Sequence, residues 1–258
     1  MKALITGASS GLGWDMAHEL SNLGYDIIAV ARRDERLIEL KNELNTDVTI
    51  VCCDVSDVAQ CKELAKYAPD VDILVNNAGF GVFGDFCTTD LDKELKMLDT
   101  NTRAMHILTK LFLNEFIKRD SGKILNVASI AAFFPGPRFS AYYATKSYVL
   151  RLSQSIAEEL RQQKSKVTIS VLCPGPVKTE FEKVASVSFG TGDELLKSGI
   201  LLKSTDVAHY AIKKFLEGKL VIIPGKLMKI SAGLRHFVSD KFLAKILYII
   251  QSNKIVRT

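Results

Sequence analysis

The sequence has few cysteines, and they follow no recognisable pattern. Five occur in 258 residues, at positions 52, 53, 61, 87 and 173. None of them forms a CxxC spacing, and no cluster of histidines lies near them. This pattern argues against both a zinc site and a disulfide framework. We therefore expect no bound metal and reduced thiols, which are typical of a cytoplasmic protein.

Long apolar runs are also missing. The opening stretch MKALITGASSGLG is too short before its first glycine to be the apolar core of a secretory signal. No other stretch approaches the roughly 18 consecutive apolar residues of a membrane-spanning helix. Helix-turn-helix spacing, zinc-finger spacing and interleaved basic and aromatic residues are absent as well, which argues against nucleic-acid binding.

The remaining composition is typical of a globular protein. Hydrophobic residues make up 47% and charged residues 24% of the chain, without an internal repeat, a low-complexity segment or a linker rich in Pro, Gly and Ser. We expect one compact α/β domain over residues 1–258. The net charge of +5 is concentrated at the end, because residues 226–258 contain seven basic side chains and one acidic side chain. This segment is predicted to be a basic amphipathic extension.

Apolar residues recur at roughly helical spacing in this extension, at positions 234, 237, 238, 242, 246, 249 and 250. One interpretation is a helix that covers the substrate cleft or a neighbouring subunit, since such stripes are usually packed. The other is a helix that lies on an anionic membrane. From the sequence we favour the packed helix.

Short strand-like runs alternate with amphipathic helical stretches along the chain. The runs are KALIT, DIIAV, VTIVC, DILVN, KILNV, VTISVL and KLVIIP. They are nearly continuous in apolar residues, as burial on both faces requires. This alternation predicts a doubly wound α/β fold of the Rossmann type, with a parallel sheet covered by helices on both faces.

A glycine-rich turn joins the first strand to the first helix. It runs from Thr6 to Gly13, and the helical stretch WDMAHELSNLG follows and ends at Gly24. Glycines allow the backbone to approach an anion closely, and free N–H groups at a helix start favour a diphosphate. The spacing TGxxxGxG differs from that of a nucleoside triphosphatase P-loop.

The residues after the second strand indicate which dinucleotide is bound. An NAD-binding unit usually has an acidic residue here for the ribose hydroxyls. This chain has Ala31, followed by Arg32, Arg33 and Asp34. Guanidinium groups pair with phosphate, so NADP(H) is predicted in preference to NAD(H). The alternative is that both arginines are solvated and Asp34 binds the ribose.

Three polar residues are candidates for catalysis. Tyr142 and Lys146 are four residues apart in a helical run and share one face. A neighbouring ammonium is expected to lower the tyrosine pKa from its usual value of about 10. Ser129 follows the apolar run KILNVA and is expected at the carboxyl edge of the sheet. A Tyr and a Lys at this spacing also occur by chance on helix surfaces, so the pair is informative only with the other motifs.

Six motifs in order resemble those of the short-chain dehydrogenase/reductase family. They are Thr6-Gly7-xxx-Gly11-x-Gly13, Asn76-Asn77-Ala78-Gly79, Asn101, Ser129, Tyr142-xxx-Lys146 and Pro174-Gly175. The resemblance covers about residues 1 to 225. It implies a single-domain Rossmann fold with a seven-stranded parallel sheet, a nicotinamide cofactor, and oxidation or reduction at an alcohol or carbonyl carbon.

The resemblance also implies roles for individual residues. The catalytic set is Asn101, Ser129, Tyr142 and Lys146, with Asn101 holding a water near the lysine. Thr100 and Ala104, which flank Asn101, depart from the usual family residues. For Asp54, helix capping is an alternative or additional role. The implied cofactor contacts are Gly7, Ser9, Ser10, Gly11, Leu12, Gly13, Arg32, Arg33, Asp54, Val55, Asn77, Ala78, Gly79, Tyr142, Lys146, Pro174, Gly175, Val177 and Thr179.

The resulting hypothesis is an NADP(H)-dependent oxidoreductase that interconverts a ketone or aldehyde and an alcohol, with Tyr142 as general acid and base. Segments 80–86, 130–139 and 180–200 are expected to border the substrate, and their mostly apolar composition favours a hydrophobic one. A weakly catalytic NADP(H) sensor of the same fold is the alternative, but it would be expected to lack one of Ser129, Tyr142 and Lys146. The family also implies a homodimer or homotetramer.

Overall fold

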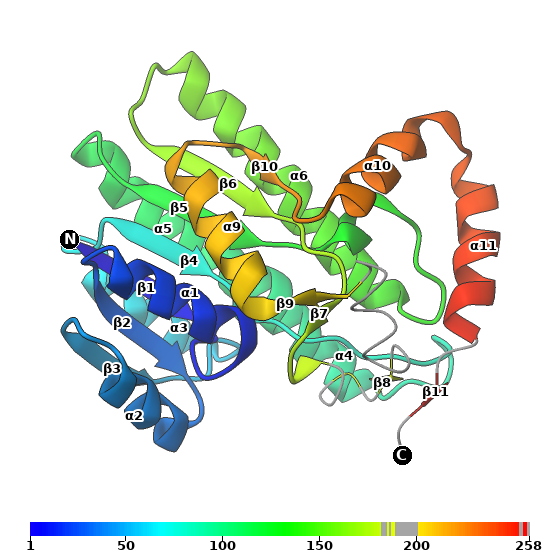
Figure 1. Cartoon of the computed structure of the whole chain (residues 1–258), viewed down its shortest axis with the longest axis horizontal. Helices are drawn as coiled ribbons and strands as arrows, with labels where there is room; N and C mark the ends of the chain where they lie inside the picture. Colours follow the sequence, from blue (N-terminus) through cyan, green and yellow to red (C-terminus); the bar gives the residue numbers. More distant parts are fainter. Residues whose placement is uncertain (182–184, 186, 189–200, 253–254, 257–258) are drawn as a thin grey trace.

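The computed structural model describes residues 1–181, 185, 187–188, 201–252 and 255–256. A parallel sheet of seven strands forms its centre, in the order β10-β6-β5-β4-β1-β2-β3 (Figure 1). All seven runs expected from the sequence are strands of this sheet, so the predicted fold is confirmed. Their bounds are β1 Lys2–Thr6, β2 Asp26–Ala31, β3 Val48–Cys52, β4 Ile73–Asn76, β5 Lys123–Val127, β6 Thr168–Leu172 and β10 Val221–Ile222.

Two hydrophobic layers enclose the sheet. Successive strand residues alternate between them: Leu4 packs in one layer, and Ala3 and Ile5 pack in the other. Helices α1 (Gly11–Asn22), α2 (Asp34–Glu43) and α9 (Ser204–Leu216) cover one face, and α3 (Val58–Glu63), η1 (Leu64–Tyr67), α5 (Met105–Lys118) and α6 (Ser140–Gln162) cover the other. Burial on both faces explains why the strands are apolar throughout.

One long helical stretch changes type at its middle. It consists of α4 (Leu91–Leu98), the π-helical segment η2 (Asp99–Ala104) and α5. A π segment accommodates one extra residue per turn and is frequently found at functional sites. Asn101 lies within η2 and is buried.

Shorter elements complete the described chain. A 3₁₀ turn, η3 (Ile130–Phe133), precedes α6. Strand β7 (Val177–Lys178) pairs in parallel with β9 (Leu202–Lys203), and β8 (Val187–Ser188) pairs antiparallel with β11 (Ile255–Val256).

The C-terminal extension forms two helices rather than the single stripe read from the sequence. They are α10 (Lys226–Leu234) and α11 (Asp240–Ser252), with η4 (Arg235–Phe237) between them. Both project from the body of the molecule beside the N-terminal end of α6 (Figure 1). Within the described residues, no helix is long and apolar enough to cross a membrane.

A buried amide network connects the sheet to two of its covering helices. Asn76 Nδ2 donates to Asn126 Oδ1 at 2.8 Å and to Thr109 Oγ1 at 3.0 Å, while Asn126 Nδ2 donates to Ser153 Oγ at 3.0 Å. The four residues belong to β4, β5, α5 and α6 and are all buried. Buried amides are stable only when hydrogen-bonded, so this network fixes the two helices against the strands that lead to the cleft.

Replacing Asn126 by alanine is expected to lower the free energy of unfolding by about 1–3 kcal/mol, because Ser153 and one bond of Asn76 lose their buried partner. Urea denaturation followed by circular dichroism measures the change. Ser155→Ala, on the exposed side of α6, serves as the control and is expected to change it by less than about 0.5 kcal/mol. Equal denaturation midpoints for the two variants would contradict the role given to the network.

Candidate active site

A cleft of about 440 Å³ lies at the carboxyl ends of the central strands. This is where ligands bind in open parallel sheets. It brings together every residue of the predicted cofactor set except Gly13, and it also contains Ser129. The sequence therefore located most of the cleft. Gly13 and Asn101 do not line it, and both act behind its wall.

The glycine turn leaves the backbone bare at one end of the cleft. Gly7 and Gly11 have positive φ values of 67° and 55°, which side chains rarely adopt. A Cβ at Gly13 would lie 2.3 Å from the Gly7 carbonyl oxygen, so this position needs glycine for close packing. Ser10 caps α1 without a side-chain hydrogen bond. The first-turn N–H groups of α1 therefore lack a side-chain partner, and the turn fits a diphosphate group.

Thr6 and Asn77 fasten this turn to the one after β4. Thr6 Oγ1 accepts hydrogen bonds from the N–H groups of Asn77 at 3.0 Å and Ala78 at 3.1 Å. The Asn77 side chain donates to the carbonyl oxygens of Thr6 at 3.1 Å and Gly7 at 3.2 Å. The two turns are thereby held as one unit.

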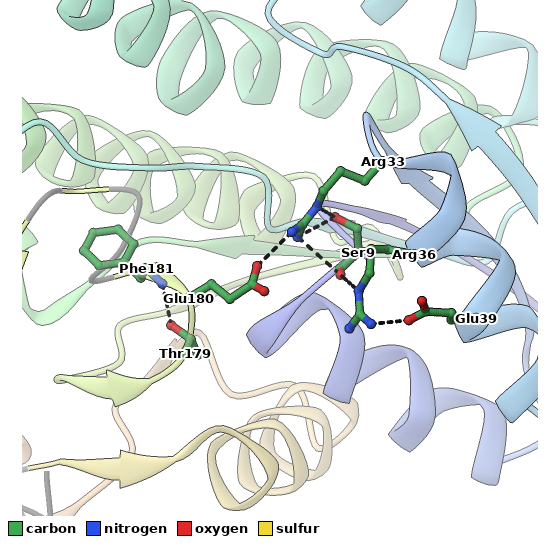
Figure 2. A network of polar contacts seen from close by, with 7 residues as sticks. All are labelled: Ser9, Arg33, Arg36, Glu39, Thr179, Glu180 and Phe181. Atoms are coloured by element: carbon green, nitrogen blue, oxygen red, sulfur yellow. Dashed lines mark hydrogen bonds and ion pairs between the residues drawn. The ribbon is translucent and has the colours of Figure 1, made fainter.

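Two arginines converge on Ser9 at the open end of the cleft (Figure 2). Arg33 Nη2 donates to Ser9 Oγ at 3.2 Å, and Arg36 Nε donates to the Ser9 carbonyl oxygen at 3.4 Å. Arg33 Nη1 also donates to Glu180 Oε2 at 2.9 Å, and this bond holds the Glu180 pKa below its usual value. Arg36 and Glu180 were not singled out in the sequence. The spacing of three residues between Arg33 and Arg36 on α2 was the available signal.

The other charged residues near this end have different environments. Arg32 is largely exposed and lies 3.9 Å from Asp54. Asp34 is exposed in the first turn of α2 and does not line the cleft, so it does not take the place of the missing acid after β2. Asp54 accepts hydrogen bonds from the N–H and Oγ of Ser56. Asp57, rather than Asp54, caps α3, and the capping alternative for Asp54 is wrong.

The three catalytic candidates meet at the closed end of the cleft. Tyr142 and Lys146 are buried one turn apart on α6. Lys146 Nζ donates to the Val127 carbonyl oxygen at 3.0 Å and lies 5.7 Å from the centre of the Tyr142 ring. Ser129 Oγ accepts from Ala131 N–H at 3.1 Å and is a hydrogen-bond partner of Tyr142.

The pKa of Tyr142 differs from the sequence expectation. Burial raises it well above its usual value, and the hydrogen bond with Ser129 offsets only part of this effect. The predicted lowering of this pKa below its usual value is therefore wrong for this structure. The physical reason is that burial penalises the phenolate, and Lys146 hydrogen-bonds a backbone carbonyl rather than the phenol. Burial also lowers the pKa of Lys146 to about 8.

Asn101 supports the catalytic residues from behind. Its side chain accepts from Phe80 N–H at 3.0 Å and donates to the Phe80 carbonyl oxygen at 2.8 Å and to Thr145 Oγ1 at 3.1 Å. A Cβ on Gly79 would lie 2.9 Å from Asn101 Oδ1 and 3.2 Å from Lys146 Nζ. A side chain at position 79 would therefore crowd the Asn101 amide and the Lys146 ammonium. Glycine lets both groups lie close to the backbone of residue 79.

Aromatic side chains surround the Tyr142 ring. Phe139 stacks on it with 4.7 Å between ring centres, and Phe181 and Tyr143 lie at 5.4 Å and 6.2 Å. Phe139 and Phe181 were within predicted substrate segments, whereas Tyr143 was identified with no role. Most of the predicted segment 180–200 lies outside the described residues.

The segment after β6 forms the remaining wall. The Pro174 carbonyl oxygen accepts from Ile130 N–H at 2.8 Å, and Val177 pairs with Leu202 in the small sheet. A Cβ at Gly11 would lie 3.0 Å from Thr179 Cγ2, and a Cβ at Gly175 would lie 2.8 Å from the Met228 side chain. Helix α10 thus packs directly on the cleft wall.

The geometry fits a dinucleotide that runs from the Ser9–Arg33 end, over the glycine turn, to Tyr142 and Lys146. The chain is also similar to known proteins. The model of the short chain dehydrogenase family matches residues 1–187. The NADP-dependent 3-hydroxy acid dehydrogenase YdfG of Escherichia coli is 31% identical over 216 residues, which cover 81% of this chain and 86% of the relative.

Two solved structures show the same fold. A short-chain dehydrogenase from Sphingobium yanoikuyae in complex with NADPH has a TM-score of 0.79 and 26% identity, with 92% of this chain and 96% of the other covered. A short chain dehydrogenase/reductase from Burkholderia phymatum in complex with NAD has a TM-score of 0.81 and 26% identity, with 92% of each chain covered. From the family match and these relatives, the chain belongs to the short-chain dehydrogenase family of oxidoreductases.

Proposed function

We propose that the protein is an NADP(H)-dependent reductase of apolar ketones or aldehydes. The observation that carries the proposal is the arrangement of Ser129, Tyr142 and Lys146 at one end of a cleft whose other end is lined by Arg33 and by Ser9, which Arg36 contacts. A nicotinamide cofactor bound in the cleft supplies the hydride. The chain orients the reactants and moves the proton.

Each catalytic residue has a distinct task in this proposal. Tyr142 donates its phenolic proton to the carbonyl oxygen as that oxygen gains negative charge, and the Ser129 hydroxyl hydrogen-bonds the same oxygen. Lys146 provides a positive charge that stabilises the phenolate formed when Tyr142 gives up its proton. Asn101 positions the wall next to Lys146 and holds a water that resupplies the proton.

Burial raises the pKa of Tyr142, so the phenol is protonated at neutral pH. Reduction of a carbonyl starts from this protonated state, whereas oxidation of an alcohol requires phenolate at the start. The resting protonation state of the tyrosine is therefore the one that the proposed reduction needs.

The preference for NADP(H) rests on the charges at Ser9. No acidic residue stands at the end of β2, where Ala31 is found, and two guanidinium groups lie beside Ser9. A ribose 2′-phosphate bound there would replace the Glu180 carboxylate as a partner of Arg33. Arginine binds phosphate through several donors at once.

The substrate class is inferred from the residues near Tyr142. Phe80, Phe139, Tyr143 and Phe181 all line the cleft. Arg138 does not line it. Its guanidinium lies 3.3 Å from Asp85 and donates to the Gln251 carbonyl oxygen at 3.5 Å. In the part of the cleft that the structure describes, no cation other than Lys146 lies at the Tyr142 end, which favours a neutral apolar carbonyl compound over a small acid.

We further propose a single domain with a C-terminal extension, a cytoplasmic location and a homodimer or homotetramer. The dimer contact would use the outer faces of α5 and α6, where Ile117 and Tyr148 are exposed. Leu108 and Phe112 of α5 are buried in the protein's own core and are not available for this contact.

Removing the Tyr142 hydroxyl is expected to abolish turnover while leaving cofactor binding intact. Tyr142→Phe should reduce kcat for NADPH-dependent reduction by about 10²- to 10⁴-fold, because the proton donor is lost. The assay follows NADPH absorbance over a panel of ketones, aldehydes and quinones, and fluorescence titration gives the NADPH Kd. Tyr148→Phe, an exposed tyrosine on the same helix, is the matched control and should keep the parent rate. Substantial turnover by Tyr142→Phe with unchanged NADPH binding would exclude Tyr142 as the donor.

The cofactor preference is tested by removing both guanidiniums at Ser9. Arg33→Ala combined with Arg36→Ala is expected to raise the NADPH Kd by more than about 10-fold, since charged hydrogen bonds contribute about 1.5–3 kcal/mol each. The NADH Kd should change by less than about 3-fold, because NADH has no 2′-phosphate. Arg151→Ala, on the exposed face of α6, controls for the loss of a positive charge. An equal loss of affinity for both cofactors would contradict the assignment.

The pH dependence of reduction should reflect Lys146, whose pKa burial lowers to about 8. Below this value the ammonium is charged and stabilises the tyrosine phenolate. As the pH rises through about 8 the charge is lost, so kcat/KM for reduction should fall. Rates over a pH series, with stability checked at each pH, give the profile. A rate that stays constant well above this pH would show that the Lys146 charge is not required.

A further inference from the structure

Helices α10 and α11 expose an unusual amount of apolar surface. On α10 these residues are Leu227, Ile230 and Leu234, and on α11 they are Phe242, Ile246, Tyr248, Ile249 and Ile250, with Phe237 in the turn between the helices. Phe237 is 87% exposed. Together they form what we call the tail surface. Apolar patches of this kind on a soluble protein usually mark an interaction site.

The exposed residues lie on one side of each helix. In α11, Phe242, Ile246 and Ile249 follow each other at spacings of four and three, which places them in one stripe. The opposite stripe faces the protein and ends at Gln251, the buried residue of this helix. In α10 the spacing of Leu227, Ile230 and Leu234 gives a similar stripe, opposite the buried Ala232. From the sequence we favoured a helix that covers the cleft or a neighbouring subunit, and in the single chain described here these stripes are exposed.

The charges beside these stripes are nearly all positive. Lys226, Lys229, Lys241 and Lys245 are exposed on the two helices, and Asp240 is the acidic residue among the described residues of this segment. A second copy of the chain seated on the tail surface would bring the same lysines together, which opposes association between two tails. An anionic partner is favoured instead.

The dimensions indicate a helix that lies along a surface. Helix α11 has 13 residues, a length of about 20 Å, whereas the hydrocarbon core of a bilayer is about 30 Å thick. An amphipathic helix with lysines beside its apolar stripe is the usual form of a segment that rests at the level of lipid headgroups.

The tail surface is held in a fixed position relative to the cleft. Gln251 Nε2 donates to Tyr143 Oη at 3.1 Å, and Arg138 Nη1 donates to the Gln251 carbonyl oxygen at 3.5 Å. Tyr143 lines the cleft next to Tyr142. On α10, Met228 packs against Gly175 in the cleft wall. Both helices are thereby anchored to residues that line the cleft.

We propose that the tail surface docks on an anionic phospholipid bilayer without crossing it. The apolar stripes enter the boundary between headgroups and acyl chains, and the lysines contact anionic headgroups. Docking places the apolar end of the cleft close to the lipid, where apolar carbonyl compounds dissolve. Lipid docking is an inference separate from the proposed reaction. Because lipid binding is measured without any substrate, a failure to bind lipid would not contradict the proposed reaction, and a lack of turnover would not contradict lipid binding.

Vesicle co-sedimentation of the full chain tests the proposal. The protein is expected to bind vesicles of phosphatidylcholine mixed with phosphatidylglycerol, and to bind phosphatidylcholine alone more weakly. Ile230→Glu combined with Ile249→Glu should weaken binding by more than about 10-fold, because two apolar contacts are lost and two negative charges are added. Lys241→Glu combined with Lys245→Glu should remove the preference for phosphatidylglycerol.

The control is Ile38→Glu, which changes an exposed isoleucine on α2. Helix α2 lies away from α10 and α11 in Figure 1. This variant should bind vesicles as strongly as the parent does. Circular dichroism and the NADPH Kd verify that each variant is folded. No binding by the parent, or equal binding by the parent and the Ile230/Ile249 variant, overturns the proposal. A parent that ignores vesicles but forms an oligomer that the same variant dissociates, as measured by light scattering, would assign the tail surface to a second copy.

Discussion

The cleft depends on a single constraint at the edge of the sheet, the hydrogen-bonded contact between Thr6 and Asn77. Parallel strands deliver all their carboxyl ends to one edge, but they do not by themselves hold the following turns together. Here the Thr6 hydroxyl accepts from two N–H groups of the turn after β4, and the Asn77 amide binds two carbonyl oxygens of the turn after β1. A side chain at position 13 would occupy the space of the Gly7 carbonyl oxygen and the Asn77 amide. The backbone of the glycine turn therefore stays accessible to a ligand because Thr6, at the end of β1, and Asn77, just after β4, hold the two turns in place.

The cleft is divided into two chemical environments, and each suits a different part of a ligand. At the Ser9 end the side chains are charged and exposed, so they can exchange a carboxylate partner for a phosphate at low cost. At the Tyr142 end the aromatic rings exclude water, which raises the tyrosine pKa and lowers the lysine pKa. The same burial that keeps the phenol protonated also makes the neighbouring cation sensitive to pH near 8. In the proposed reaction, burial by aromatic side chains therefore determines both the protonation state of Tyr142 and the polarity of the substrate that fits beside it.

Much of the fold could be predicted from the sequence, because its signals are local. Seven apolar runs became seven strands. The glycine turn was recognisable from its position between a strand and a helix, and the Tyr142–Lys146 pair was recognisable from its place among the other motifs. The rest depended on contacts between distant segments. Arg36 contacts Ser9 from 27 positions away, and Glu180 reaches Arg33 across 147 positions. The shift of the Tyr142 pKa could not be predicted either, since it depends on how deeply α6 is buried. The exposure of α11 was equally invisible, because an amphipathic stripe looks the same whether it is packed or free.

The π-helical segment η2 limits how many residues the chain can have between α4 and α5. One residue more or less in a helix rotates all the following side chains by about 100°. The extra residue in η2 lets α4 direct Met97 to the aromatic cluster around Tyr142 while α5 directs Leu108 and Phe112 to the core beneath the sheet. Deleting a single residue from η2 would restore a regular helix. It would also rotate either Met97 of α4, or Leu108 and Phe112 of α5, out of its buried position and towards solvent. A one-residue insertion or deletion of the kind that a surface loop accepts readily is therefore expected to destabilise the protein at this position.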